Sequence, residues 1–178
     1  MSYHPNAMMT LKKSIVLVGP DRCWKSTTCA ELARWFNVPI HAGKRGSERA
    51  TGTELFHGTP KVFDRGIVCA RAYDVLLQRP ARNEVDYIYA EAMMRRSGAV
   101  YVLLDRDDFS TVHDDENPHF DLGELSRIYA LLLPLTCVPY ARFTVDDDTG
   151  IDFIKLSKLT LSVIDFLSAM NALEEGEE

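Results

Sequence analysis

An apolar run that ends in glycine and leads directly into a helix-forming stretch constrains this 178-residue chain most. The stretch is SIVLVGPDRCWKSTT, residues 14–28, and it continues as CAELARWF. A strand, a tight turn and a helix N-terminus together present backbone N–H groups and partial positive charge to an anion. In the phosphate-binding pattern GxxxxGK[ST], Gly19, Lys25 and Ser26 match three of the four defining positions. The sequence therefore predicts a phosphate-binding loop in which Gly19, Lys25, Ser26 and Thr27 bind a nucleotide.

Tryptophan stands where this pattern has its second glycine. Glycine at that position lets the backbone approach a phosphate without a Cβ, and it accepts a positive φ that strains a bulky residue by about 1–2 kcal/mol. Two readings of Trp24 follow. Either the loop binds phosphate with the indole turned outward, or the loop has lost its nucleotide. We favour the first, because Lys25, Ser26 and the strand–turn–helix frame are retained.

Charge and cysteine usage narrow the class of protein. The net charge is −6 and no long basic run occurs, which argues against nucleic acid as the main partner. A small-molecule nucleotide needs only a few local cations. The four cysteines show no CxxC spacing and no zinc-ligand pattern, so reduced thiols in a cytoplasmic protein are expected. The N-terminus lacks the apolar core of a signal peptide, and no apolar run approaches the ~20 residues that span a bilayer.

Hydrophobic periodicity predicts alternating strands and helices. Strands are expected at 13–18, 38–41, 61–66, 99–105 and 141–146. Helices are expected at 26–36, 67–78, 83–96, 121–133 and 151–173. This alternation predicts an α/β fold in three layers, with a mostly parallel sheet of about five strands flanked by helices. The length favours one domain over residues 1–178, with loose tails at 1–12 and 174–178.

Two polar stretches interrupt the apolar pattern. Residues 41–60 are rich in Gly, Ser, Thr and charge, and we interpret them as a functional loop with about one helical turn. Residues 106–120 are polar and acidic and suit a short, mobile lid. Parallel sheets bind ligands at the carboxyl ends of their strands. The phosphate loop, the Asp64–Arg65 pair and the lid should therefore converge on one edge.

A second motif resembles a known family. The segment VFDRGIVCARAYD, residues 62–74, is similar to the DRYxxSxxAY segment of the thymidylate kinase family. The residues that match in register are Asp64, Arg65, Ala72 and Tyr73. Gly66 and Cys69 replace the family tyrosine and serine, and GPDRCWKST resembles the family loop GxDRxGKST. The resemblance spans about residues 13–168, is specific in these two motifs, and is as loose elsewhere as in small phage and viral nucleotide kinases.

The resemblance implies a P-loop kinase fold and an enzyme that transfers the γ-phosphoryl group of ATP, with Mg²⁺, to a deoxynucleoside monophosphate such as dTMP. Lys25 would contact the β- and γ-phosphates. Ser26 would bind Mg²⁺ through its hydroxyl, and Asp64 would orient the metal's water shell. Phosphoryl transfer needs cations around the transferring oxygens. Arg22 would supply one from the loop, because residues 107–120 contain no Lys or Arg.

The resemblance also implies roles on the acceptor side. Asp21 would accept a hydrogen bond from the sugar 3′-hydroxyl. Arg65 would bridge the acceptor phosphate and the transferring group, and Tyr73 would discriminate deoxyribose from ribose. The family's REPGGT motif is replaced here by HAGKRGSER, in which Arg45 or Arg49 could grip the acceptor phosphate.

Two other functions stay open at this point. One is a kinase of a deoxynucleoside or of a modified base in DNA. The other is a degenerate kinase fold that binds a nucleotide or a partner protein. Trp24, Gly66 and the missing acceptor motif favour it. The resemblance also suggests a homodimer, because members of the family commonly form one. The helices at 67–78 or 83–96 could form its interface.

Overall fold

A computed structural model describes residues 9–44, 46–80, 84–112, 119–145 and 152–174 of the chain. The strands are β1 (Thr10–Leu11), β2 (Ile15–Val18), β3 (Ile40–Ala42), β4 (Val62–Asp64), β5 (Val100–Asp105), β6 (Tyr140–Thr144) and β7 (Leu173–Glu174). The helices are α1 (Lys25–Phe36), α2 (Glu48–His57), α3 (Ile67–Leu76), α4 (Glu84–Ser97), α5 (Leu122–Leu135) and α6 (Phe153–Ala169). No helix in these described ranges is long and apolar enough to cross a membrane.

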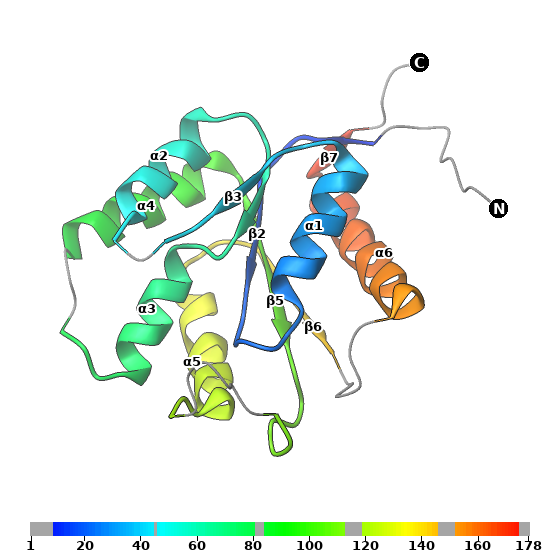
Figure 1. The fold of residues 1–178 in the computed structure, drawn as a ribbon. Coiled ribbons are helices and arrows are strands. Elements are labelled where there is room, and N and C mark those ends of the chain that lie inside the picture. Colours follow the sequence, from blue (N-terminus) through cyan, green and yellow to red (C-terminus); the bar gives the residue numbers. More distant parts are fainter. Residues whose placement is uncertain (1–8, 45, 81–83, 113–118, 146–151, 175–178) are drawn as a thin grey trace.

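Five strands form the central sheet, in the order β3-β4-β2-β5-β6 (Figure 1). Every neighbouring pair is parallel, which confirms the predicted α/β architecture. All four residues of β2 are buried apolar side chains, as expected for a parallel strand that is covered on both faces. The loop after β2 therefore starts from the middle of the sheet.

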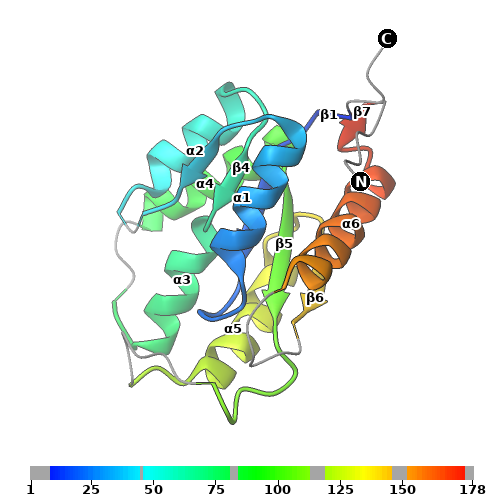
Figure 2. The ribbon, with the colours of Figure 1, turned by 45° about the vertical axis from the view of Figure 1, so that its right-hand side comes forward.

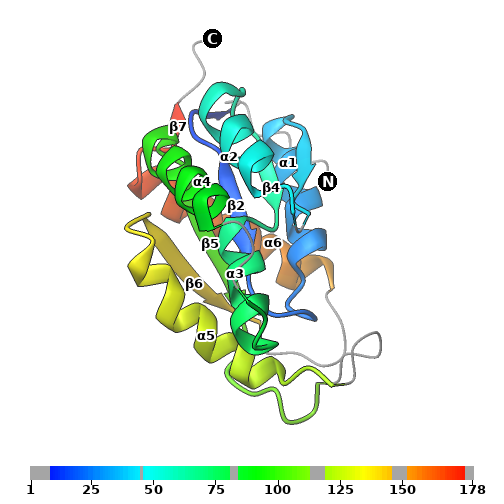
Figure 3. The same ribbon diagram turned by 90° about the vertical axis from the view of Figure 1, so that its left-hand side faces the viewer.

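Helices cover both faces of the sheet, so the fold has three layers (Figures 2 and 3). Successive side chains of a strand point to opposite faces, and β2 contributes to both cores accordingly. Val16 and Val18 pack with residues of α2, α3, α4 and α5. Ile15 and Leu17 pack with residues of α1 and α6.

Half of the polar stretch 41–60 is helical, in α2, so its prediction as a loop with about one helical turn was wrong. Helix α2 runs for 10 residues and packs beside α4, where a Cβ added to Gly52 would lie 2.7 Å from the Cα of Ala90. The two helices thus approach closely because glycine faces alanine. Thr51 and Leu55 of α2 are also buried, and Leu55 shares a core cluster with Ala90. Tertiary packing gives this segment a helix that its weak apolar pattern did not indicate.

The chain ends also differ from the prediction. Residues 10–11 lie within the predicted N-terminal tail, yet Leu11 is buried and β1 pairs antiparallel with β7. Glu174 belongs to β7, and α6 ends at Ala169 rather than at Leu173. Residues 1–8 and 175–178 of the predicted tails lie outside the described residues.

Candidate active site

The turn between β2 and α1 places the predicted phosphate loop at the carboxyl edge of the sheet. Gly19 has φ 137°, and a Cβ at this position would lie 1.9 Å from the backbone oxygen of Leu104 on β5. Only glycine fits there, since both the backbone conformation and the space exclude a side chain. The backbone N–H of Thr28 donates to the Trp24 carbonyl over 2.9 Å, which closes the first turn of α1.

Two bulky residues of the loop adopt the left-handed conformation. Arg22 has φ 63° and Trp24 has φ 58°, each of which is disfavoured for a residue with a Cβ. Trp24 is partly buried against the core between the sheet and α6, and it lines a cavity together with Phe143 of β6. The indole thus lies on the α6 side of the loop, as the first reading expects of the ring, while phosphate binding by the loop stays a prediction.

The lysine and the first hydroxyl of α1 are held close to the loop and to β4. The side chain of Lys25 is 5% exposed, and its Nζ donates to the Pro20 carbonyl and to Oδ1 of Asp21 at 3.4 Å. The Oγ of Ser26 donates to Oδ2 of Asp64 over 2.7 Å. Among the described residues, the buried Oδ1 of Asp64 has no hydrogen-bond partner. A hydroxyl and a carboxylate oxygen are hard ligands suited to Mg²⁺, so this pair fits that metal.

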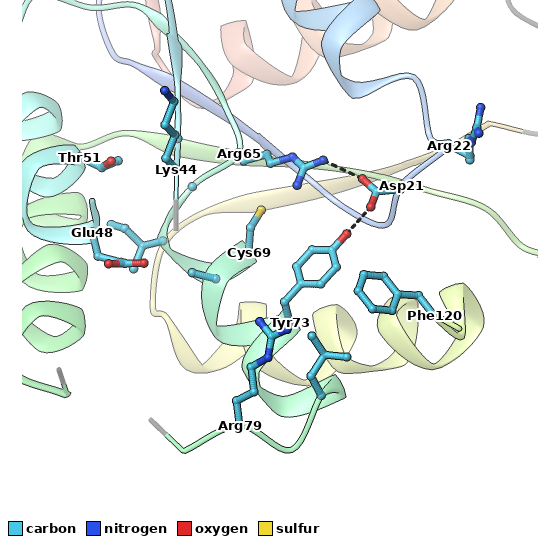
Figure 4. A pocket seen from close by; sticks show the side chains of 15 residues that line it. Asp21, Arg22, Lys44, Glu48, Thr51, Arg65, Cys69, Tyr73, Arg79 and Phe120 are labelled. Carbon is cyan, nitrogen blue, oxygen red and sulfur yellow. Dashed lines mark hydrogen bonds and ion pairs between the residues drawn. The ribbon is translucent and has the colours of Figure 1, made fainter. Parts of the chain in front are cut away.

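A second group of polar side chains centres on Asp21 (Figure 4). The Tyr73 hydroxyl donates to Oδ2 over 2.6 Å, and Nη2 of Arg65 donates to Oδ1 over 2.9 Å. Burial by itself raises the pKa of Asp21, but the positive charge of Lys25, the Tyr73 hydrogen bond and the Arg65 charge outweigh it and lower the pKa below 3.8. Burial, followed by the bond to Asp21, raises the pKa of Tyr73. Asp21 is therefore ionised and Tyr73 neutral at pH 7.

A cavity of about 540 Å³ opens beside Asp21, and we call it the Asp21 cavity. Helix α3 forms one wall, on which Tyr73 packs against Phe120 with ring centroids 5.7 Å apart. The charged side chains that line it are Arg22, Lys44, Arg65, Arg79, Asp21 and Glu48. Among the described lining residues, four cations thus face two anions. The cavity is locally cationic in a chain whose net charge is −6.

The structure brings most of the predicted site residues to this edge, with differences on the acceptor side. Arg49 does not line the Asp21 cavity. Its guanidinium bonds to Asp86 over 2.8 Å and lies 4.6 Å from the Tyr89 ring centroid. Arg45 lies outside the described residues. Lys44 and Arg79 line the cavity instead, and no motif had pointed to either of them.

The first residue of the predicted lid, Arg106, is a further residue of this region for which the sequence predicted no role. Arg106 is 7% exposed, and its Nε and Nη2 donate to the Arg22 carbonyl over 3.1 and 3.0 Å. Residue 106 follows β5, the strand beside β2. The only indication of its role in the sequence was therefore that a basic residue directly follows a predicted strand. It braces the loop at one of its left-handed residues. Residues 113–118 of the predicted lid lie outside the described part of the chain.

No protein-family model matches the sequence, and no curated protein matches it. The solved structures that resemble it include the YorR protein from Bacillus subtilis in complex with phosphorylated GDP, with a TM-score of 0.59 at 20% identity over 89% of this chain and 98% of that one. Shikimate kinase from Acinetobacter baumannii in complex with shikimate gives 0.50 at 16% identity over 88% and 93%. At these identities the likeness shows the fold, which is the α/β fold of P-loop kinases.

Proposed function

We propose that this protein is a kinase that transfers the γ-phosphoryl group of ATP, with Mg²⁺, to a deoxynucleoside monophosphate, dTMP or a related one. The proposal rests on the observation that the phosphate loop forms part of the wall of the Asp21 cavity. The loop that presents Lys25 and Ser26 at a helix N-terminus also contributes Asp21 and Arg22 to the wall of the Asp21 cavity. A donor phosphate on the loop would therefore face a ligand in the cavity.

The charges of the cavity support an anionic acceptor. Four lining cations against two lining anions, among the described residues, favour a phosphate ester over a neutral nucleoside. The Tyr73–Phe120 wall offers aromatic surface for a flat base. In their solved structures, the YorR protein holds a phosphorylated GDP and shikimate kinase holds a carboxylate, shikimate. Both ligands are small and anionic, as the acceptor proposed here is.

Each side chain has a role that follows from its position. An acceptor phosphate oxygen would attack the γ-phosphorus while the bond to the β-phosphate oxygen breaks and ADP leaves. Lys25, Arg22 and Arg65 would offset charge on the oxygens involved. A carboxylate offers about four acceptor positions, and the described residues supply three donors to Asp21. One position thus remains for a sugar hydroxyl, next to the Tyr73 ring.

The metal would be held by Ser26 and Asp64. The unpaired buried Oδ1 of Asp64 supports this assignment, since a buried carboxylate oxygen without a donor is costly. Within the described residues, no cluster of three His, Cys, Asp or Glu could hold a metal without further ligands. The remaining ligands would be water and nucleotide phosphate, as is usual for Mg²⁺. When bound, the metal would neutralise phosphate charge.

An acceptor screen tests the proposal. The purified full chain is incubated with γ-labelled ATP, MgCl₂ and, separately, each deoxynucleoside, deoxynucleoside monophosphate and duplex DNA. The proposal expects label in a deoxynucleoside diphosphate. Label in a monophosphate or in DNA would support one of the other kinase functions, and no transfer to any acceptor would support the degenerate fold. Lys25→Ala is the matched control and should abolish transfer without unfolding the domain.

A further inference from the structure

A second cavity, of about 410 Å³, lies on the other side of the phosphate loop, and we call it the Trp24 cavity. Residues from the loop, β6, the segment after β6 and α6 line it, among them Trp24, Phe143, Val145, Lys155, Lys158 and Leu159. Within the part of the chain that the structure describes, it shares no lining residue with the Asp21 cavity. The phosphate loop thus has a cavity on each side.

The direction of a bound triphosphate follows from this arrangement. In Figure 1 the loop between β2 and α1 lies between α3 on the left and the beginning of α6 on the right. The Asp21 cavity is on the α3 side, where Arg65 and Tyr73 line the proposed acceptor site. A triphosphate whose terminal phosphate faces that side carries its nucleoside toward the other side. The Trp24 cavity is where the nucleoside would lie.

The chemistry of the Trp24 cavity suits a flat heteroaromatic ring. Trp24 and Phe143 supply aromatic surface, and Val145 and Leu159 supply aliphatic surface. Lys155 and Lys158 are three residues apart on α6, so their ammonium groups lie on one helix face. Aromatic side chains stack on any base, and ammonium groups donate to the acceptor atoms at its edge.

We propose that the Trp24 cavity binds the base of the nucleotide donor, and that the Trp24 indole is the platform on which this base stacks. The inference rests on the proposed function, because it requires a triphosphate on the loop. It gives a reason for a strained residue. A left-handed tryptophan persists only where the surroundings hold it, and here Trp24 packs against the core between the sheet and α6. Base stacking by the indole would thus account for the left-handed backbone of Trp24.

Calorimetric titration of the full chain with MgATP and with magnesium tripolyphosphate separates the base from the phosphates. Trp24→Gly is the informative variant, because glycine removes the indole and adopts φ 58° without strain. We expect it to bind MgATP between about fivefold and about a hundredfold more weakly, which is the range for loss of one base–aromatic stack. Its affinity for tripolyphosphate should stay the same or increase. Trp35→Ala, at the only other tryptophan, should leave both affinities unchanged.

The possible outcomes are distinct. A tighter complex of Trp24→Gly with MgATP would overturn the inference and show that the indole obstructs the loop. An equal loss for MgATP and tripolyphosphate would also overturn it, since the indole would then only shape the loop. If the wild-type chain bound neither ligand, the proposed function would fail and the inference with it. In a Trp35→Phe protein, quenching of Trp24 fluorescence by MgATP but not by tripolyphosphate would support it independently.

Discussion

Replacing Tyr73 by phenylalanine tests the polar group around Asp21, because it removes one hydroxyl and keeps the ring that packs on Phe120. The lost bond is the 2.6 Å contact to Oδ2 of Asp21. A hydrogen bond to a charged group contributes about 1.5–3 kcal/mol. The Asp21 side chain is 20% exposed and keeps Arg65 and Lys25 as donors. We therefore expect Tyr73→Phe to lower the free energy of unfolding by about 1–2 kcal/mol, and to lower Tm by about 2–8 °C at this chain length.

The effect should depend on pH in a defined direction. The folded-state pKa of Asp21 lies below its ordinary value, so its contribution to stability is present above about pH 4 and is lost as the pH falls through the folded-state pKa. The Tyr73→Phe difference should be full at pH 7 and should shrink below pH 4. Urea unfolding of the wild-type and Tyr73→Phe proteins at pH 7 and at pH 3 measures this difference in stability. Tyr140→Phe, at an exposed tyrosine, is the control. The reasoning would be refuted if the wild-type and Tyr73→Phe proteins were equally stable at pH 7. It would also be refuted if their difference in stability were as large at pH 3 as at pH 7.

Three further predictions concern the loop, the cavity and the thiols. Gly19→Ala should cost more than about 3 kcal/mol, because its Cβ would meet the Leu104 oxygen at 1.9 Å; a near wild-type Tm by circular dichroism would contradict this. Arg79→Ala should raise the acceptor KM by about 10- to 100-fold at an unchanged KM for ATP, and steady-state kinetics should show no change for Arg49→Ala. Equal effects of Arg79→Ala and Arg49→Ala on the acceptor KM would be evidence against the Asp21 cavity as the acceptor site. A thiol reagent should label Cys137 in the native protein and all four cysteines after denaturation, because the other three are buried; rapid native labelling of a second thiol would show that the packing is wrong.

The sheet and the phosphate loop could be predicted because their signals are local. The run from Ile15 to Val18 is wholly apolar, and Gly19, Lys25 and Ser26 follow at fixed spacing. The motif at Asp64 and the topology rule for parallel strands together predicted one shared edge. Fixed spacing and uniform hydrophobicity need no knowledge of tertiary contacts.

The parts that could not be predicted depend on contacts between distant segments. Helix α2 packs closely on α4 at Gly52, which lies against Ala90, 38 positions later in the chain. Lys44 follows β3 and Arg79 follows α3, and only the folded arrangement brings both to one cavity. The short β1–β7 pair joins the two ends of the chain, and two residues on each strand are too few to show a period. Each of these features is decided by a partner that the local sequence does not contain.

The central claim is that the loop binds a triphosphate through Lys25, and calorimetric titration with MgATP tests it most directly. The account predicts a saturable isotherm with one site for the wild-type chain. It also predicts binding at least about 30-fold weaker for Lys25→Ala, since an ammonium bonded to phosphate contributes about 2 kcal/mol or more. Circular dichroism should show that the variant is folded. A flat wild-type titration at millimolar MgATP, or equal affinities of the two proteins, would contradict the account.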